Sequence, residues 1–236
     1  MTFLHVCGLI STGMSAPGYP GYHRGMTTPA FQHVVQSVEE VRALVGEPSE
    51  LGLKKQLRTL DSHCRAFIAH SPFLLLATSN AAGQCDVSPK GDAPGFVLVL
   101  DDRRLFIPDR PGNRRLDGMG NILENPHAGV IFFVPGREDT LRVNGRAWVV
   151  RDPALLERTA AMGKQPNFGI GLEVEECFLH CAKAFKRSRL WRTETWPDPG
   201  ALASMARMLL DQARPDGMTL EDMERRLHHG YTTQLY

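Results

Sequence analysis

The stretch from residue 73 to residue 150 is divided into short apolar segments by turn residues. Apolar segments of about 4–8 residues that are bounded by Gly, Pro, Asn or Asp are typical of strands. Six closely spaced strands favour an antiparallel barrel. We predict these strands at residues 73–79, 85–89, 96–100, 104–107, 128–134 and 140–150.

Helical spacing of apolar residues predicts helices on both sides of this region and one helix inside it. Ser37 and Glu40 have the spacing of a capping box at the start of a helix that ends near residue 45. Within the strand region, Asn113 is expected to cap a short helix that carries Arg114 and Arg115 in its first turn. The remaining helices are predicted at residues 49–69, 153–161, 175–185, 201–213 and 220–229.

These elements divide the chain into four parts. Residues 11–30 are rich in Gly, Pro, Ser and Thr, so we expect residues 1–30 to form a loose tail. Helices fill residues 31–72, a barrel domain fills residues 73–192, and a helical extension follows at residues 193–236. With 42% hydrophobic residues, the chain can bury a sizeable core.

The overall charge sets limits on the partners of this chain. A formal net charge of +1 gives no general attraction to nucleic acid or to an anionic membrane, so we expect neither as a partner. No uncharged apolar stretch approaches the length of a transmembrane helix. The five cysteines have no regular spacing, which is typical of reduced thiols and predicts a cytoplasmic location.

Two arginines at a helix start predict an anionic ligand. A helix N-terminus carries partial positive charge, so Arg114 and Arg115 would repel it unless an anion lies between them. A phosphate group supplies such an anion. Lys90 follows a predicted strand and is a further candidate phosphate ligand, although lysines in turns are usually solvated.

The predicted strand at residues 140–150 has one apolar and one polar face. Leu141, Val143 and Ala147 share the apolar face, because alternate residues of a strand point to the same side. The other face is either an ordinary solvated surface or a row of donors that suits the edge of a planar heterocycle. That face carries Thr140, Arg142, Asn144, Arg146 and Trp148.

The predicted helix at residues 175–185 brings polar residues onto one side. His180, Lys183 and Arg187 have helical spacing, and Trp191 follows soon after. This face either meets solvent or contacts a ligand.

A metal site and several common catalytic motifs can also be assessed from the sequence. Cys177, His180 and Cys181 would share a helical face, but a structural zinc site needs four ligands and no second cysteine pair is present. We therefore predict no metal site. The sequence contains no Walker loop, nucleophile elbow or dinucleotide-binding glycine motif, and no catalytic acid or base can be identified.

Three segments of the chain resemble the pyridoxamine 5'-phosphate oxidase-like flavoproteins. They are DVSPKGD at 86–92, LFIPDRPGNRR at 105–115 and LRVNGRA at 141–147. Within that family the chain is similar to the probable FMN-dependent enzymes of unknown substrate, and the likeness extends through residues 176–191. The resemblance implies a mainly β fold, a six-stranded antiparallel split barrel with helical additions, that forms a homodimer and binds FMN in clefts at the subunit interface.

The resemblance also implies which residues bind FMN. Lys90, Arg114 and Arg115 would contact the phosphate, with Asn113 as a polar cap. Where the vitamin-processing oxidase has an aromatic residue and a threonine beside the flavin, this chain has Ile107 and Pro108, so that oxidase's reaction is not implied. The full implied set is Ser88, Lys90, Ile107, Pro108, Asp109, Asn113, Arg114, Arg115, Thr140, Arg142, Lys183, Arg187 and Trp191.

The function implied by the resemblance is an FMN-dependent oxidoreductase. Its partners would be a second copy of the chain and a small-molecule substrate or electron donor that the sequence does not identify. Two alternatives remain open. One is a non-catalytic protein that stores or senses flavin or haem, with His180 or His127 as an axial ligand. The other is a reductase that uses a deazaflavin.

Overall fold

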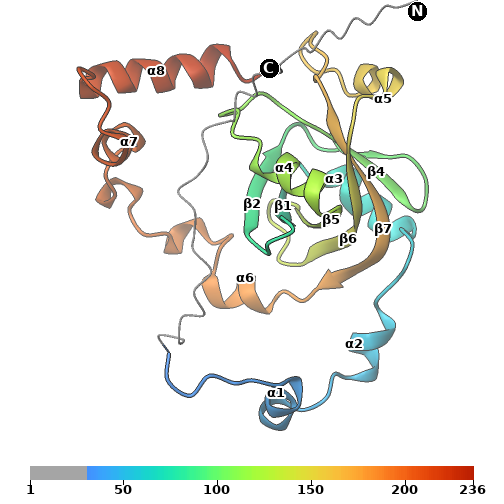
Figure 1. Ribbon diagram of the computed structural model, residues 1–236. Coiled ribbons are helices and arrows are strands. Elements are labelled where there is room, and N and C mark those ends of the chain that lie inside the picture. The colour runs from blue at the N-terminus through green and yellow to red at the C-terminus, as the bar shows by residue number, and fades with distance from the viewer. Residues whose placement is uncertain (1–30) are drawn as a thin grey trace, which may run out of the picture. The chain divides into compact units, whose positions relative to one another are not determined.

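The computed structural model describes residues 31–236 (Figure 1). The predicted tail at residues 1–30 lies outside the described residues. The chain divides into two compact units, Met1–Glu47 and Pro48–Tyr236. Helix α1 (Val38–Val45) belongs to the first unit, and every other described element belongs to the second.

A single antiparallel sheet forms the centre of the second unit (Figure 1). Its strand order is β2-β1-β5-β6-β7-β4-β3. The mainly β fold with flanking helices that the sequence predicts is confirmed, although the sheet has seven strands rather than six. The strands are β1 (Phe73–Ser79), β2 (Cys85–Gly91), β3 (Leu98–Val99), β4 (Arg104–Pro108), β5 (His127–Phe133), β6 (Thr140–Val150) and β7 (Gly169–His180).

The seventh strand corrects the prediction of a helix at residues 175–185. Strand β7 pairs with β4 through its first residues and with β6 along its full length. Asn144 pairs with Glu176 and Gly145 pairs with Val174, so Glu175 is an extra residue in a β-bulge. The bulge changes which alternate residues face the core, and this change conceals the strand pattern in the second half of β7.

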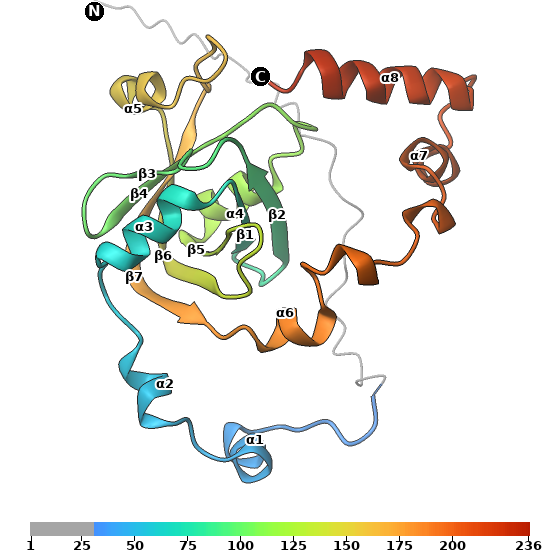
Figure 2. The same ribbon diagram turned by 180° about the vertical axis from the view of Figure 1, so that it is seen from behind.

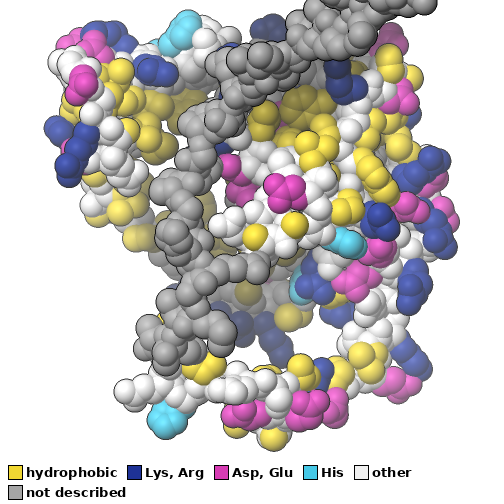
Figure 3. Space-filling model, viewed as in Figure 1, with side chains coloured by type: hydrophobic (Ala, Val, Ile, Leu, Met, Phe, Trp, Pro, Cys, Tyr) yellow, Lys and Arg dark blue, Asp and Glu magenta, His cyan; other side chains and the backbone are white. Residues whose placement is uncertain are grey.

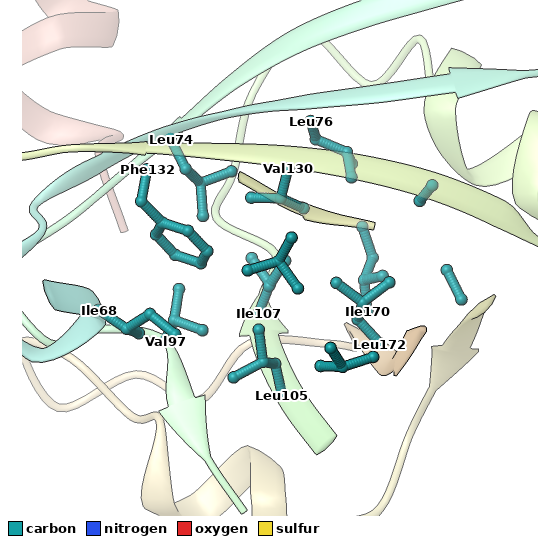
Figure 4. Packing of buried hydrophobic residues seen from close by; sticks show 14 of the residues in the cluster. Ile68, Leu74, Leu76, Val97, Leu105, Ile107, Val130, Phe132, Ile170 and Leu172 are labelled. Atoms are coloured by element: carbon teal, nitrogen blue, oxygen red, sulfur yellow. The ribbon is translucent and has the colours of Figure 1, made fainter. Parts of the chain in front are cut away.

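The core fills the space enclosed by the sheet (Figure 4). Side chains from β1 and β5 point toward side chains from β4 and β7, and Ile68 from helix α3 (Ser62–His70) closes one side. The predicted apolar face of β6 is confirmed, since Leu141, Val143 and Ala147 are fully buried. The residues labelled in Figure 4 are Ile68, Leu74, Leu76, Val97, Leu105, Ile107, Val130, Phe132, Ile170 and Leu172.

The single helix predicted at residues 49–69 is two helices, α2 (Glu50–Lys54) and α3. Between them, the backbone N–H of Leu57 donates to the carbonyl of Cys177 at 2.9 Å, and the N–H of Cys177 donates back at 2.8 Å. This bridge to β7 holds Leu57 in extended backbone. Asp61 then starts α3 as its N-cap and accepts from the N–H of Cys64.

The other helices lie around the sheet. Helix α4 (Asp117–Glu124) lies on one side of it and α3 on the opposite side (Figures 1 and 2). Helix α5 (Pro153–Arg158) joins β6 to β7, and α6 (Lys183–Ser188) follows β7. No helix among residues 31–236 combines the length and apolarity needed to cross a membrane.

The chain continues from α6 into two short 3₁₀ helices, η1 (Thr193–Thr195) and η2 (Pro199–Ala201), and two longer α-helices. Helices α7 (Met205–Ala213) and α8 (Leu220–Thr233) pack against each other, and the capping box at Thr219 fixes the start of α8. Hydrophobic side chains of this pair are visible at the molecular surface (Figure 3). They include Met205, Met208 and Tyr231.

Candidate functional site

A cavity of about 1440 Å³ lies where β2, the segment after β4, the segment before β7 and the end of α8 meet. The segment after β4 contains the turn that begins α4. The cavity is therefore built from four parts of the chain that are far apart in the sequence. Its lining comprises residues 86–90, 109–119, 164–168, 226, 227, 230, 231 and 233–236.

The charges around the cavity favour an anionic ligand. Six Lys or Arg side chains line it, against three Asp side chains. The positive charge is local, because the whole chain carries a net charge of only +1. The cations are Lys90, Arg110, Arg114, Arg115, Lys164 and Arg226, and the carboxylates are Asp86, Asp109 and Asp117.

Lys90 projects from β2 and forms an ion pair with Asp109. Its Nζ lies 2.8 Å from Asp109 Oδ1, and each side chain is 17% exposed. An ammonium group has three hydrogens, so this bond leaves donors for a further acceptor. Lys90 is therefore oriented at the cavity wall and retains the capacity to bind an anion.

A second pair anchors the end of the chain beside the cavity. Arg110 Nε lies 2.6 Å from Asp92 Oδ2, and the Asp92 side chain is only 5% exposed. The hydroxyl of Tyr236 donates to the other oxygen of Asp92 at 2.7 Å. Lys164 Nζ donates to the carbonyl oxygen of Tyr236 at 2.6 Å. These contacts hold residues 233–236 as one wall of the cavity.

The turn at residues 113–117 differs from the prediction that Asn113 caps a helix with two arginines in its first turn. Helix α4 begins at Asp117, so both arginines precede it, and Leu116 is its N-cap without a side-chain cap. Asn113 Oδ1 instead accepts from the N–H of Arg115 at 3.0 Å, and Arg115 Nε donates to Asp117 Oδ2 at 2.8 Å. An aspartate in the first turn suits the helix dipole. The cations at residues 114 and 115 are thus outside the helix and at the rim of the cavity.

The backbone of this turn is strained. Arg114 and Leu116 both have a φ of 61°, a left-handed conformation that residues other than glycine seldom adopt. Arg114 is exposed and, among the described residues, forms no hydrogen bond or ion pair with another side chain or with the backbone. Strained residues of this kind cluster at ligand-binding sites.

Six residues of the set implied by the family resemblance line this cavity. They are Ser88, Lys90, Asp109, Asn113, Arg114 and Arg115. Ile107 and Pro108 are buried and do not line it, and the Ile107 side chain points into the core (Figure 4). Any contact of Ile107 with a ligand would have to come from its backbone.

The other implied residues lie outside the lining of the cavity. Lys183 and Arg187 are on α6, and Trp191 follows it and donates from Nε1 to the carbonyl of Arg137 at 2.6 Å. His180 ends β7, so the predicted helical face shared by His180, Lys183 and Arg187 does not exist. The helical face proposed for Cys177, His180 and Cys181 is wrong for the same reason. Within residues 31–236, no group of three or more His, Cys, Asp or Glu side chains could hold a metal ion.

Thr140 and Arg142 lie at the start of β6 and belong to a cluster that is separate from the cavity. Thr140 is buried and pairs with His180, and Arg142 pairs with Phe178. The Arg142 guanidinium lies 4.2 Å from the centre of the Phe178 ring, and Lys55 lies over the same ring at 5.2 Å. Burial, and then the charges of Arg142 and Lys55, lower the pKa of His180 below its ordinary value. His180 is therefore predominantly neutral at pH 7.

Sequence reasoning missed several residues that line the cavity. Lys164 comes from a loop, Arg226 from α8 and Tyr236 from the residues after α8, and their local sequence carries no ligand-binding motif. Arg110 lies inside the segment LFIPDRPGNRR at residues 105–115, but only its ion pair with Asp92 shows where its side chain lies.

Among solved structures, the chain is similar to a putative pyridoxamine 5'-phosphate oxidase from Lactobacillus delbrueckii, with 26% identity over 52% of this chain and 98% of that one, and a TM-score of 0.41. It is also similar to HupZ from Group A Streptococcus, with 20% identity over 50% of this chain and 92% of that one, and a TM-score of 0.41. A third similar structure is HutZ, a haem storage protein from Vibrio cholerae, with 17% identity over 51% of this chain and 93% of that one, and a TM-score of 0.37.

Comparison with protein sequences and family models shows the family of the chain. No curated protein matches the chain. A family model described as pyridoxamine 5'-phosphate oxidase matches residues 60–181, which is more than half of the chain and includes all seven strands. The chain therefore belongs to the pyridoxamine 5'-phosphate oxidase family.

Proposed function

We propose that this protein binds FMN in the cavity and is an FMN-dependent oxidoreductase. The observation that carries the proposal is the convergence of Lys90, Arg114 and Arg115 on one cavity in which cations outnumber carboxylates two to one. FMN ends in a phosphate group, which is the kind of anion that such a cluster binds.

The residues of the cavity fit this cofactor. Arg114 has no partner among the described residues, and Lys90 keeps donors beyond its bond to Asp109. Asn113 fixes the backbone of the turn through its bond to Arg115. The volume of about 1440 Å³ exceeds the roughly 300–1,000 Å³ of common ligand pockets, so it has room for a cofactor and a substrate.

The protein and the cofactor would have different roles in the reaction. FMN, when bound, supplies electron and hydride transfer. The residues of this chain would hold its phosphate: Lys90 from β2, and Arg114 and Arg115 from the turn before α4. The wall formed by residues 233–236 would limit the access of water to the cavity.

We also propose that the active form is a homodimer. Thr140, Arg142, Lys183, Arg187 and Trp191 do not line the cavity of their own chain. A second copy would bring these residues to the cofactor. Sedimentation of the purified protein tests this point, because a dimer mass supports the proposal and a monomer mass at assay concentrations contradicts it.

Removal of the two arginines tests the phosphate assignment. The variant Arg114→Ala with Arg115→Ala should lose FMN and keep its thermal stability, since the Arg115–Asp117 ion pair is exposed and contributes little. Arg65→Ala is a matched control, because Arg65 is an exposed arginine on α3 outside the cavity. If the double variant retains one FMN per chain, the phosphate assignment is wrong.

A further inference from the structure

Two polar atoms are buried without any hydrogen-bond partner in the part of the chain that the structure describes. They are Nε of Arg142 and Nε2 of His180. A buried donor without a partner destabilises the folded state, so such atoms are rare in folded proteins. Two of them in one place indicate that a partner is supplied from outside the chain.

The two atoms belong to side chains on the same face of neighbouring strands. Arg142 of β6 pairs with Phe178 of β7, and His180 is two residues further along β7. Alternate residues of a strand point to the same side, so Arg142 and His180 are diagonal neighbours about 7–8 Å apart at Cα. The rings of Phe178 and His180 are 5.0 Å apart between their centres.

The cluster is fixed before any ligand arrives. The Phe178 ring lies against the Arg142 guanidinium at 4.2 Å and under Lys55 Nζ at 5.2 Å. Lys55 is further tied by a 2.7 Å bond from Nζ to the carbonyl oxygen of Leu179. Side chains that are held in place lose little entropy when a ligand binds.

The charges of the cluster favour an anion. Lys55 and Arg142 are cations, and the nearest carboxylate belongs to Glu176. Glu176 Oε1 lies 3.7 Å from NH2 of Arg142, beyond hydrogen-bond distance, and accepts from Asn144 at 2.6 Å. Its other oxygen accepts from Gln56. Glu176 therefore leaves Nε of Arg142 without a partner.

We propose that Arg142 and His180 form a binding site for the oxyanion group of a small molecule, a carboxylate or a phosphate. Nε of Arg142 donates to one oxygen, and His180 donates to another with its proton on Nε2. The Arg142 side chain as a whole is 36% exposed, although its Nε is buried. The site lies outside the lining of the first cavity of the same chain, and the titration below uses the protein without added FMN.

Histidine resonances give a direct test on the full chain. The protein is labelled with ¹³C-histidine and titrated with inorganic phosphate and, separately, with acetate, at constant ionic strength set by chloride. His180→Gln identifies the His180 resonance. We expect that resonance to shift and saturate with at least one of the two anions. A shift with phosphate alone indicates a phosphate-bearing ligand, and a shift with acetate alone indicates a carboxylate.

Two arginine variants complete the test. Arg142→Gln should weaken anion binding at least about tenfold, the loss expected for one charge-assisted hydrogen bond. Arg146→Gln is the matched control, since Arg146 is an exposed residue of the same strand and should leave binding unchanged. A His180 resonance that neither anion moves, or an affinity that Arg142→Gln does not change, overturns the proposal. The wild-type titration decides the question even if Arg142→Gln does not fold.

Discussion

Replacement of Arg114 by glycine should stabilise the protein without FMN and weaken its affinity for FMN. Arg114 has a φ of 61°. This left-handed conformation costs an L-residue with a Cβ about 1–2 kcal/mol, and it costs glycine little. The arginine has no partner to lose among the described residues. Because glycine also makes the unfolded chain more flexible, we expect a net gain of about 1 kcal/mol in the free energy of unfolding.

The expected loss of affinity has a different origin. One charge-assisted hydrogen bond to phosphate contributes about 1.5–3 kcal/mol, which corresponds to a rise in Kd of about 10- to 100-fold. Titration of the apoprotein with FMN, followed by flavin fluorescence, measures this change. Thermal unfolding of the apoprotein measures the gain in stability, which corresponds to about 2–4 °C in Tm for a chain of this size.

Arg214→Gly is the matched control for this experiment. Arg214 is also a left-handed arginine, with a φ of 44°, but it caps the C-terminus of α7 and does not line the cavity. Its replacement should raise Tm by a similar amount and leave FMN affinity unchanged. If Arg114→Gly is stabilised and binds FMN as tightly as the wild type, Arg114 is not a phosphate ligand.

Two further changes test the fold. Gly145→Ala should lower the free energy of unfolding by about 3 kcal/mol or more, because a Cβ there would lie 1.9 Å from the carbonyl oxygen of Glu173; wild-type resistance to urea would contradict the bulge geometry. Burial raises the pKa of Asp92, but hydrogen bonds from Tyr236, a backbone N–H and Arg110 together lower it below its usual 3.8. A carboxyl group whose pKa is lowered by folding stabilises the fold at pH values above its pKa in the unfolded chain. This stabilisation is lost as the pH falls, so below about pH 4 the wild type should lose stability faster than Asp92→Asn. Parallel pH profiles of Tm would contradict this.

The strands could be predicted from the sequence because their signal is local. Strands β1 and β6 have the predicted bounds, since β-forming residues run without interruption between turn residues. The second half of β7 could not be predicted, because the bulge at Glu175 breaks the alternation. The break between α2 and α3 was equally hidden, since the backbone bridge at Leu57 involves Cys177, 120 residues further along the chain.

The sequence likewise identifies some residues of the candidate site but not their contacts. Lys90 and the arginines at 114 and 115 could be identified from short segments whose charges are unusual for their position. The ion pairs of Lys90 with Asp109 and of Arg115 with Asp117 could not be predicted, because a sequence does not show which carboxylate a cation will face. The position of the chain after α8 is fixed by contacts of Tyr236 with Asp92 and Lys164, which are distant in the sequence.

The mass of the bound ligand tests the central claim most directly. The purified protein is incubated with FMN, freed of excess ligand and denatured, and the released ligand is identified by mass spectrometry. We expect one FMN per chain for the wild type and none for the variant that carries Arg114→Ala and Arg115→Ala. Release of haem or a deazaflavin instead, or no FMN from the wild type, would contradict the assignment of the cavity.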